Sequence, residues 1–219
     1  MRRMFFLFIL LCLLSAAAHA EIVGRTHEDY IHRHIAGNGQ AIYFLSMEEE
    51  PSIHAEDVNF DGTDDLVVCT AQGASNAFYE FFVFDGAQYV LAGRDGYPGG
   101  GLANYALHPE KGLVSTQANN GYAGLLHDAL LFRWEGTKMV EVRRALSDHT
   151  TSSLEDGDVR VQLTDYGSVT LRVTEPAYDS EGYRDADAVL WEYAATLDDL
   201  YGSEQQILQE EQNVLWRGL

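Results

Sequence analysis

Short apolar runs, each followed by a turn-forming segment, dominate the middle of the chain. Residues 78–84 and 88–92 flank Asp85-Gly86, a dipeptide typical of two-residue hairpin turns. Three further pairs of runs are arranged in the same way: 102–107 with 113–117, 129–134 with 137–143, and 159–164 with 169–174. Short strands at this spacing predict a mainly β fold, built as an antiparallel hairpin meander.

A weak internal sequence repeat refines this prediction. The pattern Phe82-x-Phe84-Asp85-Gly86 returns 50 residues later as Phe132-x-Trp134-Glu135-Gly136. Such a period lies within the range of blade-like β repeats. Because two copies cannot close a propeller, we expect a blade-like arrangement, either a partial propeller or a sandwich.

The C-terminal end has a different pattern. In residues 197–215 the apolar positions Leu200, Ile207, Leu208 and Leu215 are separated by acids and glutamines, which predicts an amphipathic helix. We expect this helix to be broken near Gly202, with Ser203 as its N-cap and Gln206 completing a capping box. Residues 177–219 are thus interpreted as an acidic loop and a C-terminal α-helix that packs on the β domain.

The N-terminus has the features of a secretory signal. Arg2 and Arg3 precede an apolar segment, residues 4–14, which is too short to span a bilayer. Ala18-His19-Ala20 is a small-x-small cleavage site. We therefore expect a signal peptide over 1–20, an N-terminal segment over 21–52 and a calcium-binding β domain over 53–176, in the periplasm or outside the cell, with no membrane attachment after cleavage.

The calcium assignment comes from one loop, read in place as EDVNFDGTDDLVV. Asp57, Asn59, Asp61 and Asp65 occupy positions 1, 3, 5 and 9, and Gly62 at position 6 permits a sharp turn. Calcium takes six to eight oxygen ligands, so alternate oxygen-bearing side chains in one tight loop suit it. The backbone carbonyl of Thr63 is the expected further ligand.

The segment after the loop excludes an EF-hand. That motif needs helices on both sides and a bidentate Glu at position 12. Here position 12 is Val68, inside an apolar run that predicts a buried strand. The alternative to a metal site is an Asp/Asn-rich turn without metal.

The loop resembles the calcium loop of FG-GAP and VCBS-type β repeats, and the chain is similar to small exported bacterial proteins with one such loop. The resemblance covers residues 53–144 and also rests on the stretches FFVFDGAQYV and NNGYAGLLHDALLFRWEG. Some of those proteins are periplasmic immunity proteins or inhibitors of lysozyme-like peptidoglycan hydrolases, including toxins delivered by type IV secretion. The resemblance therefore implies Ca²⁺ as cofactor and a peptidoglycan hydrolase as partner.

Composition supports a cationic partner. The formal net charge is −20, which repels nucleic acid and anionic headgroups and attracts basic proteins, although it also serves solubility. After signal cleavage Cys69 is the only cysteine left, and its apolar context predicts a core residue. The sequence has no nucleophile elbow, phosphate loop or dinucleotide-binding motif, so we expect a non-catalytic protein.

Two glycine-rich loops are candidate recognition elements. Tyr97 lies within residues 94–101, and Tyr122 follows Asn120 and Gly121 within residues 119–124. A Tyr on such a loop adds apolar area and a hydrogen-bonding group to an interface, whereas in a plain hairpin turn it would fold back on the sheet. The leading hypothesis is an inhibitor or immunity protein. A calcium-dependent glycan- or peptide-binding module and an uncharacterised hydrolase remain as alternatives.

Overall fold

The chain is described here by a computed structural model over residues 30–94, 101–121, 126–148, 150–155, 158–163, 168–181 and 183–219. The predicted signal peptide lies outside these residues. The expected mainly β fold with a C-terminal helix is confirmed: antiparallel strands are followed by α2, Leu197–Leu215. No helix among the described residues is both long and apolar enough to cross a membrane.

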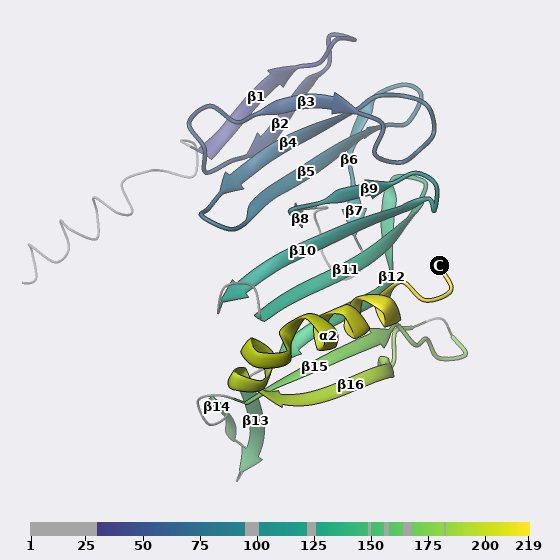
Figure 1. Cartoon of the computed structure of the whole chain (residues 1–219). Coiled ribbons are helices and arrows are strands. Elements are labelled where there is room, and N and C mark those ends of the chain that lie inside the picture. The colour runs from purple at the N-terminus through teal and green to yellow at the C-terminus, as the bar shows by residue number, and fades with distance from the viewer. Residues whose placement is uncertain are drawn as a thin grey trace, which may run out of the picture.

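The larger sheet follows the order β16-β15-β12-β11-β10-β9, and all neighbours along it are antiparallel. A short strand, β7, pairs with β12 in parallel. Figure 1 shows this sheet as the lower part of a tall stack of strands. Its strands are β7 (Gly93–Arg94), β9 (Ala106–His108), β10 (Leu113–Gly121), β11 (Leu126–Glu135), β12 (Lys138–Asp148), β15 (Ser168–Glu175) and β16 (Ala188–Thr196).

The smaller sheet follows the order β3-β4-β5-β6, with β8 paired to β5. Two further hairpins, β1–β2 and β13–β14, each form a separate two-stranded sheet. The strands are β1 (Ile31–Ile35), β2 (Ala41–Leu45), β3 (Ile53–Glu56), β4 (Asp65–Gln72), β5 (Ala77–Phe84), β6 (Tyr89–Leu91), β8 (Leu102–Ala103), β13 (Thr150–Glu155) and β14 (Asp158–Leu163).

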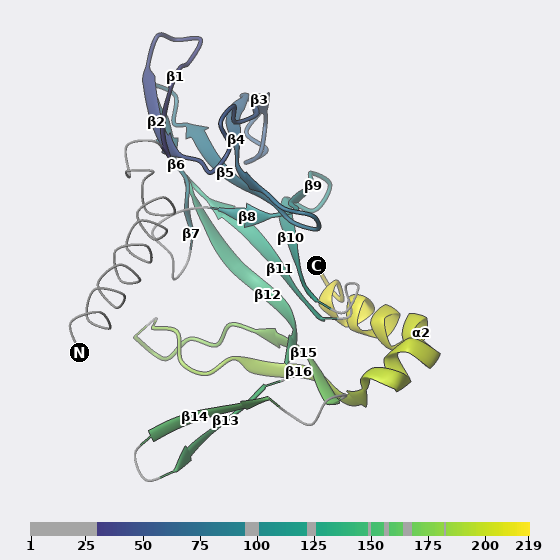
Figure 2. The same cartoon turned by 90° about the vertical axis from the view of Figure 1, so that its left-hand side faces the viewer.

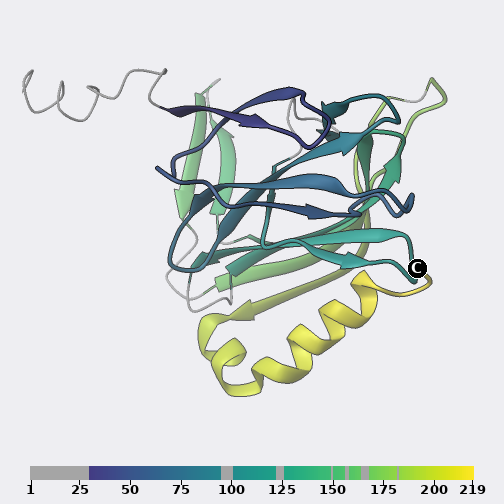
Figure 3. The same ribbon diagram turned by 90° about the horizontal axis from the view of Figure 1, so that it is seen from above.

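Buried clusters join these parts into successive layers. Phe81 and Val83 of the smaller sheet pack with Val114, Phe132 and Met139 of the larger one, which gives the sandwich-like core. The other face of the smaller sheet is covered by the β1–β2 hairpin, while the outer face of the larger sheet is covered by α2. Figures 2 and 3 show α2 lying across one face of the larger sheet.

Long-range polar contacts fix α2 on the sheet. Arg143 of β12 donates from Nη1 to the carbonyls of Val214, Leu215 and Arg217, at 3.0, 3.0 and 2.9 Å. The last carbonyls of a helix have no intrahelical partner, so a cation at this end satisfies them and complements the helix dipole. On the N-terminal side of these residues, Glu211 of the helix is fully buried and forms a 2.7 Å hydrogen bond with Nε2 of His127.

Three of the four predicted hairpins are present, one of them only in part. The 78–84/88–92 and 129–134/137–143 pairs correspond to β5–β6 and β11–β12. The 102–107/113–117 pair is present in part: β9 pairs with β10, whereas Leu102–Ala103 form β8 and pair with β5, after a break at Asn104, whose φ is +43°. The fourth prediction is wrong, because β14 pairs with β13, and β15 pairs with β12 and β16.

The predicted break in the C-terminal helix is also wrong. The helix is continuous through Gly202. A glycine inside a helix costs only about 0.5–1 kcal/mol, which packing of the helix on the sheet offsets. The predicted burial of Cys69 is confirmed, with the residue in the core and not in a disulfide. Strand β16, for which no strand was predicted, completes the larger sheet beside β15.

Candidate metal centre and a separate groove

The predicted calcium loop is the connection between β3 and β4. The Asp57 carboxylate accepts hydrogen bonds from the backbone N–H groups of Asp61 and Gly62, at 3.1 and 2.9 Å. Oδ1 of Asn59 accepts from the same Asp61 N–H at 3.1 Å. Oδ1 of Asp61 accepts from the N–H of Thr63 at 2.8 Å. The loop therefore turns its oxygen-bearing side chains inward, around its own backbone.

Alternation within the loop separates the polar residues from the core. Val58 is fully buried in the cluster between the two sheets, and Phe60 packs against that cluster. Asp57, Asn59 and Asp61 alternate with them and carry the hydrogen bonds described above. The backbone makes the turn through two positive φ angles, +65° at Phe60 and +87° at Gly62. Gly62 thus has the conformational role expected of it.

Asp65, the first residue of β4, connects the loop to the neighbouring strand. It is fully buried; Oδ1 accepts from the N–H of Phe84 on β5 at 2.8 Å, and Oδ2 accepts from the N–H of Val58 at 3.2 Å. Burial is the main cause that raises the pKa of this carboxyl to about 6, and the nearby charge of Asp61 raises it further. An ionised Asp65 here experiences desolvation and like-charge repulsion, both of which a cation would relieve.

The donor set fits a hard cation. Carboxylate and amide oxygens are the groups that Ca²⁺ prefers, and each carboxylate oxygen that accepts one N–H keeps a second lone pair. Nδ2 of Asn59 donates to Oδ2 of Asp61 at 3.0 Å, which contributes most to lowering the pKa of Asp61 and keeps it ionised. Across the described residues, no three His, Cys, Asp or Glu side chains already gather around one point. Binding would therefore require a local adjustment that draws Asp57, Asp61 and Asp65 closer together.

Two of the predicted recognition residues lie away from this loop, at the end of β10, where the neighbouring Asn119 contacts Asn76 of the β4–β5 connection. Asn120 is exposed near the end of β10, and Gly121 closes that strand at an irregularity in its pairing with β11. Figure 1 shows β10 ending at the edge of the stack opposite the β3–β4 loop. Tyr97 and Tyr122 lie outside the described residues, so their role stays a prediction.

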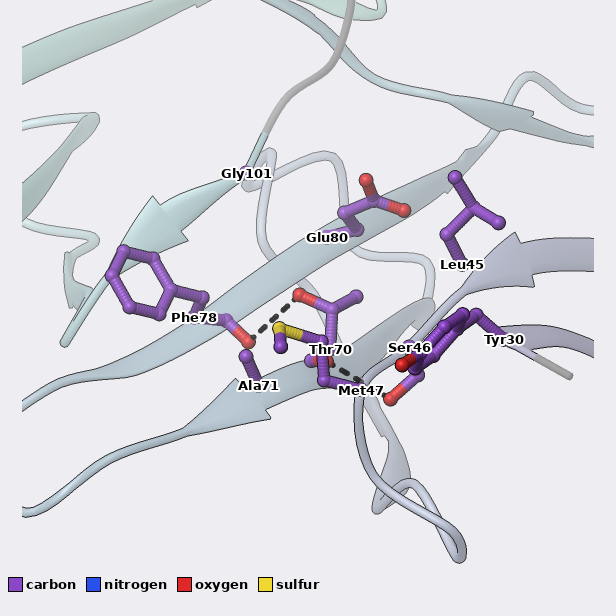
Figure 4. Close-up of a pocket in the computed structure, with 9 residues that line it drawn as sticks. All are labelled: Tyr30, Leu45, Ser46, Met47, Thr70, Ala71, Phe78, Glu80 and Gly101. Carbon is purple, nitrogen blue, oxygen red and sulfur yellow. Dashed lines mark hydrogen bonds between the residues drawn. The ribbon is translucent and has the colours of Figure 1, made fainter. Parts of the chain in front are cut away.

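A groove that the sequence did not indicate lies on the smaller sheet. It has a volume of about 520 Å³, and Figure 4 shows Phe78 and Glu80 of β5 on one side with Leu45, Ser46 and Met47 on the other. Thr70 forms part of its floor and donates from Oγ1 to the carbonyl of Phe78 at 3.3 Å. The only sequence signal was the alternation along β5, in which Phe78 and Glu80 share the face of the buried Phe82.

Comparison with known proteins gives little further guidance. No protein-family model matches the chain, and no curated protein matches it. A solved structure titled "Structure of a Xanthomonas Type IV Secretion System related protein" is similar at a TM-score of 0.38 and 14% sequence identity, over 62% of this chain and 79% of that one. A likeness at this level carries no conclusion about the fold or function of this chain.

Proposed function

We propose that the chain is an exported calcium-binding protein, without catalytic activity, that binds and inhibits a basic, lysozyme-like peptidoglycan hydrolase in the periplasm. The observation that carries the calcium part is that Asp57, Asn59 and Asp61 all accept hydrogen bonds from the backbone of one turn, with the buried Asp65 at its base. The inhibitory part is supported by the loop resemblance and by the net charge of −20, which favours a cationic partner.

Calcium would have a structural role. Its ligands lie in the loop that joins β3 to β4, and Asp65 is hydrogen-bonded to β5 through Phe84. A cation held there would link all three strands at one end of the smaller sheet. Because the folded chain binds the ion and the unfolded chain does not, folding gains the binding free energy, about 2.7 kcal/mol when free calcium is 100 times its Kd.

The partner assignment is tested by peptidoglycan clearing assays. Several basic lysozyme-like enzymes are assayed with the protein, in calcium and again with a chelator. We expect stoichiometric inhibition of at least one enzyme, weakened when chelation loosens the fold. If no enzyme is inhibited, the inhibitor assignment is wrong.

The same assay separates the alternatives. Clearing by the protein alone, abolished by a single acidic substitution, would assign a hydrolase. Retention on peptidoglycan only in calcium, without inhibition, would assign a glycan-binding module.

A further inference from the structure

The groove exists because the β1–β2 hairpin covers only part of the smaller sheet. Ile42 and Phe44 of the hairpin pack on Val68 and Phe82, which lie on one face of β4 and β5. The same face continues past the hairpin to Glu80, directly opposite Val68, and then to Phe78. No described strand or helix covers this continuation, which is the floor of the groove.

The walls of the groove are apolar and exposed. Leu45 is 59% exposed, Met47 is 71% exposed and Phe78 is 42% exposed. All three line the same cavity, so they form a continuous surface and are not scattered. Contiguous exposed apolar surface in a groove is a mark of a binding site, and Met adapts its shape to different partners.

Glu80 is the one charged side chain among the described residues that line the groove. It is half-buried, and among the residues that the structure describes none donates a hydrogen bond to its carboxylate or forms an ion pair with it. Burial raises the pKa of its carboxyl, because desolvation disfavours the ionised form. Only water compensates this carboxylate within the described part of the chain, so a ligand that brings a hydrogen-bond donor would gain from pairing with it.

The apolar walls and the carboxylate together determine which kind of ligand fits the groove. An anionic ligand would be repelled by Glu80, and a purely apolar one would bury its charge without a partner, at a cost in binding. A lysine or arginine side chain meets both demands, because its aliphatic stem packs on Leu45 and Met47 while its charged end reaches the carboxylate.

We propose that the groove between β2 and β5 binds a lysine or arginine side chain presented by a basic protein partner, with Glu80 as its counter-ion. This proposal rests on the proposed function only for the identity of that partner. The groove lies at the opposite end of β4 from the calcium loop, because Asp65 begins the strand and Thr70 and Ala71 lie near its end. Five or six residues of strand separate the two by roughly 17–20 Å, so substitutions at each can be examined separately.

The first experiment uses small probes and the full mature chain. n-Hexylammonium, n-butylguanidinium and n-hexanoate are titrated while the methyl resonances of Met47 and Leu45 are followed by NMR. Both cations are expected to shift these resonances in a saturable way, and hexanoate is expected to leave them unchanged. Equal shifts with hexanoate, or no shift with either cation, would overturn the proposal.

Two variants locate the interaction. Glu80→Gln removes an uncompensated half-buried charge and is expected to fold normally and to bind the cations at least fivefold more weakly. Glu110→Gln makes the same chemical change in an exposed turn and should bind them like the natural chain. If Glu80→Gln binds as tightly as Glu110→Gln, Glu80 is not the counter-ion and the proposal fails.

The second experiment uses a hydrolase that the natural chain inhibits. Glu80→Gln is expected to inhibit it at least fivefold more weakly, while Glu110→Gln inhibits normally. Undiminished inhibition by Glu80→Gln would reject the groove and leave the inhibitor function standing. Cation binding that depends on Glu80, together with failure to inhibit any hydrolase, would instead reject that function and keep the groove. A dimer that Phe78→Ala dissolves would assign the groove to a second copy of the chain and overturn the proposal.

Discussion

The two sheets are stabilised in different ways. The outer face of the larger sheet is closed by the chain itself: α2 lies across it, Arg143 caps the end of the helix, and Glu211 is buried against His127. Within the described residues no helix packs on the smaller sheet, and one end of it is organised by the carboxylate-rich loop between β3 and β4. The first arrangement is complete without a ligand, whereas the second gathers negative charge that a cation would neutralise.

The largest loss of stability is expected when the contacts that hold α2 on the larger sheet are removed. Arg143→Ala removes a buried guanidinium and leaves the carbonyls of Val214, Leu215 and Arg217, together with Glu175, without that partner. Loss of one member of a buried charged network costs about 3–5 kcal/mol, or roughly 10 °C in the thermal midpoint of a domain of this size.

The control for that change is Arg133→Ala. Arg133 forms an exposed ion pair with Glu135, and such pairs contribute about 0–1 kcal/mol. Calorimetry or circular dichroism would measure both variants. Equal losses would mean that the Arg143 cap is no more important than a surface contact.

The second-largest effect is expected on the stabilisation that calcium gives through the β3–β4 loop. Asp61→Ala removes a central carboxylate, so the stabilisation by calcium, about 2.7 kcal/mol at 100 times Kd, should disappear. Asp64→Ala removes the same charge from an exposed neighbour without a loop hydrogen bond and should keep that stabilisation. Differential scanning fluorimetry with calcium and with a chelator compares them, and identical behaviour of the two variants would exclude the loop as the site.

Because the pKa of Asp65 is raised, both the stability of the smaller sheet and its calcium affinity should depend on pH. Without calcium, the folded state holds the Asp65 proton more tightly than the unfolded state, so this group's contribution to stability is greatest below about pH 4 and is lost as pH rises through about 6. Calcium binds the ionised form, so its affinity should rise over the same range and be about tenfold weaker at pH 5 than at pH 7.5. Calcium titrations at the two pH values give the ratio, and a pH-independent affinity would remove Asp65 from the ligands.

The smallest loss of stability is expected from a change to the backbone conformation of the β3–β4 loop. Gly62→Ala places a side chain at φ +87° with no atom within 4 Å of the new Cβ, so its cost is conformational, about 1 kcal/mol. Gly37→Ala adds a methyl group to equally open space without a positive φ and should be neutral or slightly stabilising. Chemical denaturation resolves the difference, and equal stabilities would show that the loop tolerates other backbone conformations.

The parts of this fold that were predictable are those determined by residues close together in the sequence. Hairpins such as β5–β6 and β11–β12 follow from an Asp-Gly or Glu-Gly turn between apolar runs, and the loop from alternating oxygen-bearing residues. The pairing of β15 with β12 and β16 was not predictable in this way, because long stretches of sequence separate these strands. Packing against α2, and not a local turn, selects their pairing.

The groove was unpredictable for a similar reason. Phe78 and Glu80 read as two ordinary positions on an alternating strand. Their exposure depends on where a hairpin from another part of the chain stops covering the sheet. The C-terminal helix illustrates the opposite error, since the local signal at Gly202 predicted a break that the packed helix does not have.

Hydrogen exchange of the native protein, with and without calcium, tests the central claim most directly. If the β3–β4 loop binds the ion and holds the smaller sheet, calcium should slow amide exchange in β3, β4 and β5, around Glu56, Asp65 and Phe84. The amides of β11, β12 and β15 should exchange at unchanged rates, because α2 and Arg143 stabilise that half without the ion. Protection confined to the larger sheet, or no change with calcium anywhere, would contradict the account.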